Sequence, residues 1–504
     1  MKHLSVLLLL GGLPVYAASP RFEVTDYGVR ADGKTNDAAA IQKAIDACNR
    51  KGGGTVYVPP GNYLSGTIVL KSNVTLYLDP GATIWGSRQT SDFNPRHLIY
   101  AKGAENIAIE GGGTINGNGE AYWTPDFRPR EHRPSPYIEL EECRNVRIRD
   151  VRIRNTPGWA IHPLNCDGVW IRGISIVSPM QGPNTDGIDP DSSRNVFISD
   201  SYIETGDDCI VLKTTGRTGL PARACENIAV TNCVLVSDDT ALKLGTESFG
   251  DFRHISFTGC VIRGTRVGLG IYAKDGGTFE AVSFSGITME TYPTHPDKIE
   301  YPIFIDLEKR KADSKPSLVR DISFNDLIIH TRGRALIGGM PDNPLQNLSF
   351  RNVFMRVAGF VPVEGVKKTR GSANVVAAGR ETDYAEVPAA FIFANVRGLE
   401  LRDVRVLWES AERPPERHAI YAARVDGLRI AGFTGRQAAP GGKLAAIGLD
   451  NVRNVFVTGS EAAEGTGVFL GTREMSREQI VLEGNSLANA RSLLEEGATH
   501  VHMK

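Results

Sequence analysis

The sequence predicts an all-β solenoid, built from short strands that repeat along most of its 504 residues. Each copy reads Asn or Gly, apolar, any, apolar, any, then a turn-forming Asp, Asn or Gly and a last apolar residue. Copies recur mostly at about 23 to 33 residues, a period typical of stacked repeats. The alternation gives every strand one inward face, which only stacking can bury. Copies begin at Asn73, Asn106, Asn145, Gly168, Asn195, Asn227, His254, Ala281, Asp321, Asn347, Gly398, Gly427 and Asn454.

The N-terminus has the layout of a secretory signal peptide over residues 1–17. Lys2 and His3 precede the apolar run Leu4–Leu10, and Val15–Ala17 form a small-residue cleavage context. The apolar run is too short to span a bilayer, and no cysteine follows it for lipid attachment. We therefore expect a secreted protein, periplasmic or extracellular, without a membrane anchor.

Residues 18–504 are predicted to form one repeat domain. A helix is expected near its start, at about residues 36–48, where an Asn-Asp N-cap precedes apolar residues at helical spacing. We assign this α-helix the task of covering the open end of the solenoid. A strand, Gly52–Leu64, follows it. The polar segment Val366–Pro388 is predicted to be a long loop, and residues from about 485 to 504 a C-terminal cap or tail.

Composition excludes some partners. The formal net charge is −1 and the isoelectric point is about 6.8, which gives no support for nucleic acid or an anionic membrane surface. The seven cysteines include two pairs at shared repeat positions, Cys143 with Cys166 and Cys233 with Cys260. We favour buried thiols over disulfides for them. No CxxC and no metal-ligand spacing is present, so neither a metal nor another cofactor is expected. The oligomeric state stays open.

Two motifs in successive repeats carry the candidate chemistry. NTDGID spans Asn184–Asp189, and TGDDC spans Thr205–Cys209. If the repeats stack, Asp186, Asp207 and Asp208 converge on one surface. Close carboxylates repel each other, so one is held as a proton donor while another stays ionised. Such a pair is what hydrolysis of a glycosidic bond requires. Aspartates at corners, such as Asp150, Asp200 and Asp326, are instead expected to make local turn contacts.

Together with the opening segment Phe22–Cys48 and the following GGGTVYVPPGNYL, these motifs resemble glycoside hydrolase family 28, the family of the polygalacturonases. The resemblance implies a right-handed parallel β-helix and an inverting hydrolase. It further implies that Asp207 is the general acid, that Asp186 and Asp208 activate water, and that Asn184 orients a carboxylate or hydroxyl. Neighbouring coils lie about 4.8 Å apart, so we expect side-chain splay to widen the gap between acid and base.

The chain departs from the family pattern in the next two coils. Where the family carries GHG, this sequence has Thr240 at the histidine position. Where it carries RIK, Gly270 and Tyr272 take the two basic positions. The basic pair would bind a uronate carboxylate, so its loss indicates an exo-acting enzyme or one for decorated pectin.

Several further residues are candidates for substrate binding. Lysines could bind a uronate or neutralise the acids, and Lys243 is predicted to lie two coils from Asp189 on one ladder. Glu247 could contact sugar hydroxyls, act as an alternative acid or form a surface ion pair with a lysine, and His162 could reach substrate or sit in a turn. Tyr272 and Trp159 could stack on a sugar or pack, and Arg128, Arg130 and Arg133 could bind anions or be solvated. The set of substrate-binding candidates is Asn184, Asp189, Lys213, Lys243, Lys274, Tyr272, Glu247 and His162.

Three functions remain open from the sequence. The first is a hydrolase of acidic, galacturonate-containing polysaccharide or its oligomers. The second is a polysaccharide lyase on the same fold, with Lys243 as base and calcium held by the three aspartates. The third is a carbohydrate-binding solenoid without chemistry. The loops at residues 122–136 and 292–315 are expected to set the sugar and the linkage.

Overall fold

The computed structural model describes residues 20–292, 300–359, 387–409, 414–475, 480–494 and 502–503. The predicted signal peptide, nearly all of the predicted loop Val366–Pro388, part of the loop at 292–315 and part of the predicted tail lie outside these ranges. Among the residues described, no helix is both long and apolar enough to cross a membrane.

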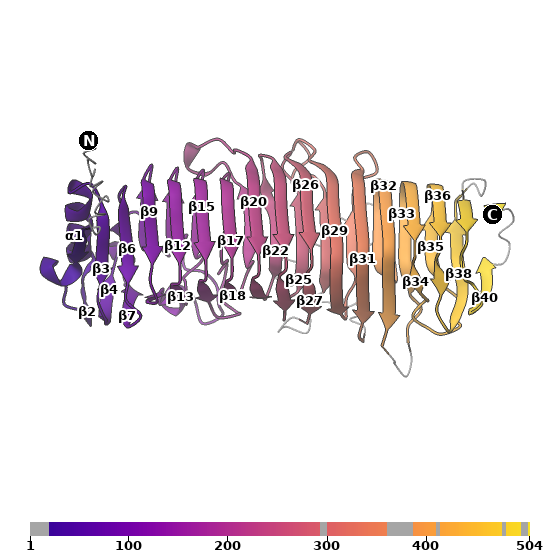
Figure 1. Ribbon diagram of the computed structural model, residues 1–504, viewed down its shortest axis with the longest axis horizontal. Helices are drawn as coiled ribbons and strands as arrows, with labels where there is room; N and C mark the ends of the chain where they lie inside the picture. Colours follow the sequence, from indigo (N-terminus) through magenta and orange to yellow (C-terminus); the bar gives the residue numbers. More distant parts are fainter. Residues whose placement is uncertain are drawn as a thin grey trace, which may run out of the picture.

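The chain winds into a right-handed parallel β-helix, as predicted, with strands stacked along one long axis (Figure 1). Its strands form three columns, and every pairing between named strands is parallel. The first column consists of β1 (Arg21–Glu23), β3 (Gly54–Val58), β6 (Val74–Leu78), β9 (Glu105–Glu110), β12 (Arg144–Arg149), β15 (Asp167–Arg172), β17 (Arg194–Ser199), β20 (Cys225–Thr231), β23 (Phe252–Thr258), β26 (Thr278–Ser285), β29 (Leu318–Thr331), β31 (Leu345–Val357), β32 (Ala389–Trp408), β33 (His418–Ala431), β36 (Arg453–Thr458), β39 (Ile480–Glu483) and β41 (His502–Met503).

The other two columns are joined to the first by corners. The long strands β29 and β31 continue from the first column into the second, β33 runs from the third into the first, and β32 runs through all three. The second column contains β2 (Asp32–Asn36), β4 (Gly61–Ser65), β7 (Ala82–Gly86), β10 (Thr114–Asn116), β13 (Arg152–Arg154), β16 (Ser175–Val177), β18 (Tyr202–Thr205), β21 (Val234–Ser237), β24 (Val261–Arg263), β27 (Thr288–Thr291), β34 (Thr434–Gly435) and β37 (Glu461–Ala462). The third contains β5 (Ile68–Val69), β8 (Ile99–Lys102), β11 (Ile138–Glu141), β14 (Ile161–Leu164), β19 (Ile210–Thr214), β22 (Thr240–Ser248), β25 (Val267–Ala273), β28 (Tyr301–Leu307), β30 (Ala335–Gly338), β35 (Ala445–Asp450), β38 (Thr466–Arg473) and β40 (Ala490–Leu494).

The predicted repeat explains the two corners that flank each strand of the first column. The first residue of a copy has a positive φ, 52° at Asn145 and 56° at Asn195. The turn residue five positions later has one too, 63° at Asp150 and 55° at Asp200. Asn and Asp adopt this left-handed conformation more readily than other residues with a Cβ. These positions in the repeat therefore predict where the backbone changes direction.

The core is the inward column of alternating apolar side chains. Its aromatic residues stack coil upon coil: ring centroids are 4.9 Å apart between Phe257 and Phe284 and 5.1 Å between Phe284 and Phe324. All seven cysteines are buried and free, and Cys143 and Cys166 share one ladder position as predicted. Replacing one such core phenylalanine by alanine should cost about 3–5 kcal/mol.

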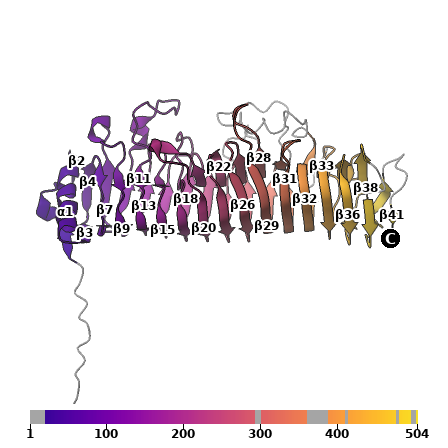
Figure 2. The same cartoon turned by 90° about the horizontal axis from the view of Figure 1, so that it is seen from above.

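The ends of the solenoid differ from each other. The predicted capping helix is α1 (Ala38–Arg50), which buries Ile41, Ala44, Ile45 and Cys48 against the first coil. In the described part of the chain, four short 3-10 helices lie in connections: η1 (Val24–Tyr27), η2 (Thr90–Asp92), η3 (Gly119–Tyr122) and η4 (Arg217–Gly219). At the other end β40 and β41 pair with β38 and β39, so coil stacking continues into the segment predicted to be a cap or tail. Figure 2 shows loops of the N-terminal half projecting from one side of the solenoid.

Candidate active site

The third strand column brings the two acidic motifs together. Ile188 pairs with Ile210 on the next coil, so Asp186 and Asp208, each two residues earlier, are in register. Gly187 allows this close approach, because a Cβ at this position would lie 2.5 Å from the carbonyl oxygen of Cys209. The motif glycine therefore serves the packing of one acidic turn on the next.

Asp186, Asp207 and Asp208 form one cluster. Each offers a carboxylate oxygen, and these oxygens all lie within 4.8 Å of one another. Asp207 is partly exposed, whereas Asp186 and Asp208 are 3% and 1% exposed. Within the described residues, Asp186 Oδ1 and Asp208 Oδ1 are buried without a hydrogen-bond partner. An unpaired buried oxygen is costly, so these two atoms are suited to accept a hydrogen bond from a water molecule enclosed beside them. The expected splay between acid and base is not seen at these nearest oxygens.

Two acids of the cluster have raised pKa values. Burial raises the pKa of Asp207 well above its usual range, and the charges of Asp186 and Asp208 raise it further. Burial, with the charge of Asp189, likewise raises the pKa of Asp186. Lys243 opposes both shifts. The raised pKa values favour a proton on one carboxyl group of this cluster, which suits that group to act as an acid.

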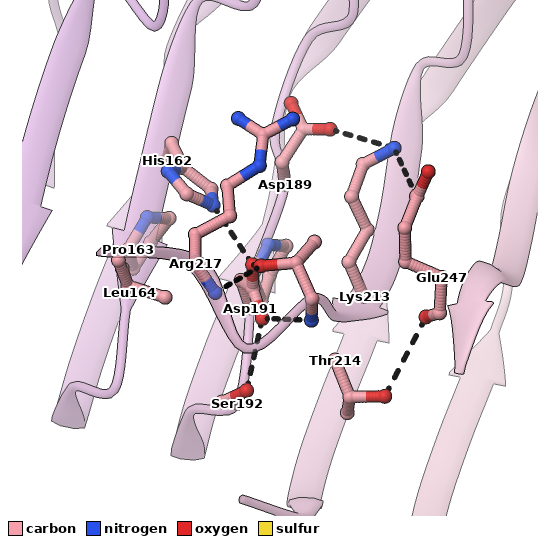
Figure 3. Close-up of polar contacts among 12 residues, drawn as sticks. His162, Pro163, Leu164, Asp189, Asp191, Ser192, Lys213, Thr214, Arg217 and Glu247 are labelled. Atoms are coloured by element: carbon pink, nitrogen blue, oxygen red, sulfur yellow. Dashed lines mark hydrogen bonds and ion pairs between the residues drawn. The ribbon is translucent and has the colours of Figure 1, made fainter. Parts of the chain in front are cut away.

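Two lysines neutralise part of the negative charge. Lys243 Nζ lies 2.7 Å from Asp208 Oδ2. Lys213 Nζ lies 3.6 Å from Asp186, 3.5 Å from Asp189 and 3.7 Å from Glu247, as Figure 3 shows for the last two. Burial raises the pKa of Asp189 to about 7, although Lys213 opposes the shift. Of the predicted alternatives for the lysines, the structure favours neutralisation of the acids.

Carboxylate oxygens are good ligands for hard divalent cations, and the trio has the spacing to hold one. Lys243 already places a positive charge against Asp208. A cation at this point would therefore be repelled by the ammonium group, and the cluster can keep its charge balance through the lysine instead.

Asn184 lies beside the proposed acid, as predicted. Its Nδ2 is 3.4 Å from Asp207 Oδ2, and its Oδ1 accepts a hydrogen bond from Arg133 at 2.9 Å. Arg133 also donates to the carbonyl oxygens of Pro157 and Pro183, at 2.9 and 2.6 Å. Of the arginines in the loop at 122–136, this one thus fixes the turn that carries Asn184. Sequence left its role open because the two residues are 51 positions apart.

Four predicted substrate contacts need correction. Asp189 is 0% exposed and lies 3.5 Å from Lys213 Nζ. His162 is 1% exposed, and its ring nitrogens contact Glu139 at 2.7 Å and Asp191 at 3.3 Å. Lys274 is 2% exposed and forms ion pairs with Asp306, at 2.6 Å, and with Glu308. Tyr272 is buried against Tyr301 and Phe304. All four side chains lie on the outward face of the third column, as the repeat predicts, but neighbouring side chains cover them.

Sequence reasoning also missed two groups near the acids. Arg266 is buried and forms an ion pair with Asp239, one coil beyond Asp207. Asp191 accepts from His162 and from the backbone of Thr215. The ladder rule that found Asp186 and Asp208 could have found Asp191, since it lies two residues past Asp189 on the same outward face.

Comparison with known proteins agrees with this picture. The sequence matches the family described as glycosyl hydrolases family 28 over residues 48–332. It is 33% identical over 214 residues to a probable polygalacturonase of Vitis vinifera, covering 38% of this chain and 44% of that protein. A solved family 28 exopolygalacturonase of Yersinia enterocolitica superposes with a TM-score of 0.61 at 20% identity, over 87% of this chain and 78% of that one. An exopolygalacturonase of Thermotoga maritima gives 0.58 at 24% identity, over 67% and 87%.

The acidic cluster lies on a parallel β-helix, within the residues that match the family. The family match covers more than half of the chain, and the chain belongs to glycosyl hydrolases family 28. The match to the grape protein spans less than half of that relative's length.

Proposed function

We propose that this protein hydrolyses glycosidic bonds of acidic, galacturonate-containing polysaccharide or its oligomers. The observation that carries the proposal is the convergence of Asp186, Asp207 and Asp208 within 4.8 Å on one face of the solenoid. Asp207 is the proton donor to the leaving oxygen, since it is the most exposed of the three and has a raised pKa.

Inversion of configuration fits the burial of the other two acids. In a retaining reaction one carboxylate must attack the sugar carbon itself. Asp186 and Asp208 are almost fully buried, which opposes that contact, and each has a buried oxygen without a hydrogen-bond partner that can accept from a water molecule enclosed beside it. Together they take its proton as it attacks the anomeric carbon. The short spacing of the acids is closer to the roughly 5–5.5 Å typical of retaining enzymes, so the configuration of the product is the decisive measurement.

We further propose that the enzyme cleaves from a chain end and that it is exported. Two of the similar solved structures are exopolygalacturonases, which supports release of short products from a chain end. The composition of residues 1–17 supports export to the periplasm or beyond.

The test is hydrolysis of defined galacturonate oligomers, with reducing ends counted and the anomeric configuration followed by proton NMR. We expect the inverted anomer and short products from the first minutes. Retention would contradict the proposed mechanism, and a product absorbing in the ultraviolet would indicate a lyase.

Asp207→Asn should lower kcat by about 10²- to 10⁴-fold, the usual contribution of a general acid. Asp200→Asn is a matched control, because Asp200 is an exposed corner residue with a φ of 55° and Asn232 occupies the same corner one coil later. Equal activity of the two variants would contradict the role of Asp207.

A further inference from the structure

A cavity of about 490 Å³ lies on the outward face of the second column, near the N-terminal end of the solenoid. This volume is within the roughly 300–1,000 Å³ usual for small-molecule sites. Its apolar lining is Leu64 of β4 and Trp85 of β7, which pair on neighbouring coils (Figure 1). Its polar lining includes Asp32, Asn62, Arg88, Gln89 and Asn118. An aromatic surface with a few polar groups around it suits a sugar ring, which has apolar faces and a polar edge.

Trp85 is fixed by a hydrogen bond at the edge of its ring. Its Nε1 donates to Oδ1 of Asn62, which is one coil earlier, at 3.1 Å. The residues of β7 alternate between buried and partly exposed, and Trp85 is partly exposed on the outward face. Among the described residues, no cation and no second aromatic ring is stacked on it. The hydrogen bond uses the N–H in the plane of the indole, so the ring face can contact a ligand.

The cavity has an acidic residue and a basic residue at different levels along its strands. Asp32 pairs with Asn62 near the start of the strands, whereas Arg88 follows the end of β7. Asp32 accepts hydrogen bonds from the backbone of Thr35 and Lys34 and from the Thr35 hydroxyl, which lower its pKa to about 2. Its carboxylate is therefore charged. A sugar carboxylate in this cavity is attracted by Arg88 and repelled by Asp32, which can instead accept from sugar hydroxyls.

Arg88 is available as a cation for such a ligand. It is exposed, and it lines both this cavity and a neighbouring one of about 420 Å³. In the part of the chain that the structure describes, its side chain has no ion pair, hydrogen bond or ring contact. The lysines at the acidic cluster, Lys213 and Lys243, are by contrast held by aspartates. A guanidinium group without a protein partner can pair with a carboxylate in a planar, bidentate way.

This cavity is separate from the acidic cluster. Three pairings lead from it to the coil that carries Asp186: Trp85 with Asn116, Asn116 with Arg154, and Arg154 with Val177. Trp85 is thus three coils, or roughly 14 Å along the axis, before that coil. A uronate beside the clustered aspartates is repelled. Charges separated by more than the Debye length of about 8 Å at physiological salt are largely screened, so a uronate in this cavity is spared most of that repulsion.

We propose that this cavity is a second, non-catalytic carbohydrate site that binds a uronic acid residue, with the sugar ring on Trp85 and its carboxylate on Arg88. The amides of Asn62, Gln89 and Asn118 supply donors and acceptors for the sugar hydroxyls. The inference rests on the proposed function for the class of polysaccharide. It gives the protein a place to hold an acidic chain away from the acids that cleave it.

The experiment counts bound sugar separately from turnover. Equilibrium dialysis with a labelled galacturonic acid trimer is carried out on the Asp207→Asn variant, in which cleavage is suppressed. We expect two trimers per chain at saturation, and one when Trp85→Ala is added. Trp170→Ala is the control, because Trp170 is 41% exposed on β15 of the first column, and it should leave the number at two.

The charge of Arg88 is tested at the same site. Adding Arg88→Gln should raise the Kd of the second site for the trimer about tenfold or more, as expected for losing a charge-assisted pair, and leave that for the methyl ester unchanged. Arg88→Lys should fall between, because lysine keeps the charge without the planar fork. Arg96→Gln, at an exposed arginine of the same connection between β7 and β8, is the control. Because Arg88 is exposed, its variants keep the test valid even if Trp85→Ala fails to fold.

The outcomes are distinct. A number of bound trimers that Trp85→Ala leaves unchanged, with cleavage by the wild type, overturns the inference while the proposed function stands. A trimer that is lost with Trp85→Ala, without cleavage by the wild type, keeps the second site and contradicts the proposed function. If the trimer is neither bound nor cleaved, both fail. An equal rise in Kd for the acid and the ester on Arg88→Gln would overturn the pairing of Arg88 with the carboxylate.

Discussion

Lys243 lies 2.7 Å from Asp208, reaching back from one coil to the acidic turn of the coil before it. Its ammonium group also lies 4.8 Å from the centroid of the Tyr272 ring, so it is enclosed between an acid and an aromatic face. The same charge lowers the pKa of Asp186 and of Asp207, against the burial that raises them. One lysine thus acts on all three carboxyl groups of the cluster.

Lys243→Met should therefore shift the pH dependence of kcat/KM. Without the ammonium group, the pKa of Asp186 and Asp207 rises further, so the base is ionised only at higher pH. The acidic limb of the profile should move up by about one pH unit, and kcat should fall about tenfold or more. Lys309→Met, an exposed lysine just past β28, is the control. An unchanged acidic limb would contradict the role of Lys243.

Arg133 should act through Asn184. Its guanidinium holds Asn184 Oδ1, which turns the amide N–H group toward Asp207. Arg133→Met frees the amide to rotate, and a carboxylate that loses a donor has a higher pKa. We expect kcat to fall several-fold and the alkaline limb to move to higher pH. Combined with Asn184→Ala, the losses should be non-additive, with a coupling of about 0.5–3 kcal/mol. Additive losses with an unmoved alkaline limb would show that the two residues act separately. Arg128→Met is the control from the same loop.

The stability of the protein should depend on His162 in a defined pH window. Burial disfavours its charge, but Glu139 and Asp191 raise its pKa from 6.5 to about 10. Below pH 6.5 the folded and unfolded states are both protonated, and the contribution is complete. Between pH 6.5 and about 10 it is lost as the pH rises, by an amount on the order of a few kcal/mol.

Urea unfolding followed by tryptophan fluorescence at pH 6, 8 and 10 checks this. The difference between wild type and His162→Gln should be largest at pH 6 and shrink toward pH 10. The exposed His254 supplies the control, His254→Gln. A difference that grows with pH would mean that His162 is neutral in the folded state.

Lys274→Met should damage the fold and leave binding intact. The lysine is buried with Asp306 and Glu308, and removing one partner of a buried ion pair costs about 3–5 kcal/mol. We expect a lower unfolding midpoint in urea with an unchanged KM for the galacturonic acid trimer. Lys443→Met, at an exposed lysine, should alter neither quantity. A raised KM at full stability would restore the sequence-based prediction of a substrate contact.

Much of the site could be predicted because each repeat is defined by residues that are close together in the sequence. Alternation determines which side chains point outward, and the turn residues mark each corner. Counting along the copies was therefore enough to place Asp186 beside Asp208 and His162 one coil before Asp189. Counting along the repeats could not predict which of the outward side chains remain accessible to solvent. Lys274 and Tyr272 face the predicted way, yet Asp306 and Phe304 of the next coil cover them.

By itself, the sequence determined the stacked coils, the capping helix and the meeting of the acidic turns, because each follows from residues close together in the chain. The tertiary structure decided which partners those acids have. A register shift between Leu212 and Thr214 accompanies the approach of Glu247 to Lys213. Arg133 reaches Asn184, and Arg217 lies on Trp159, only through irregular connections. The loops between strands do not follow the repeat pattern. Their contacts with the acids therefore depend on the folded chain as a whole.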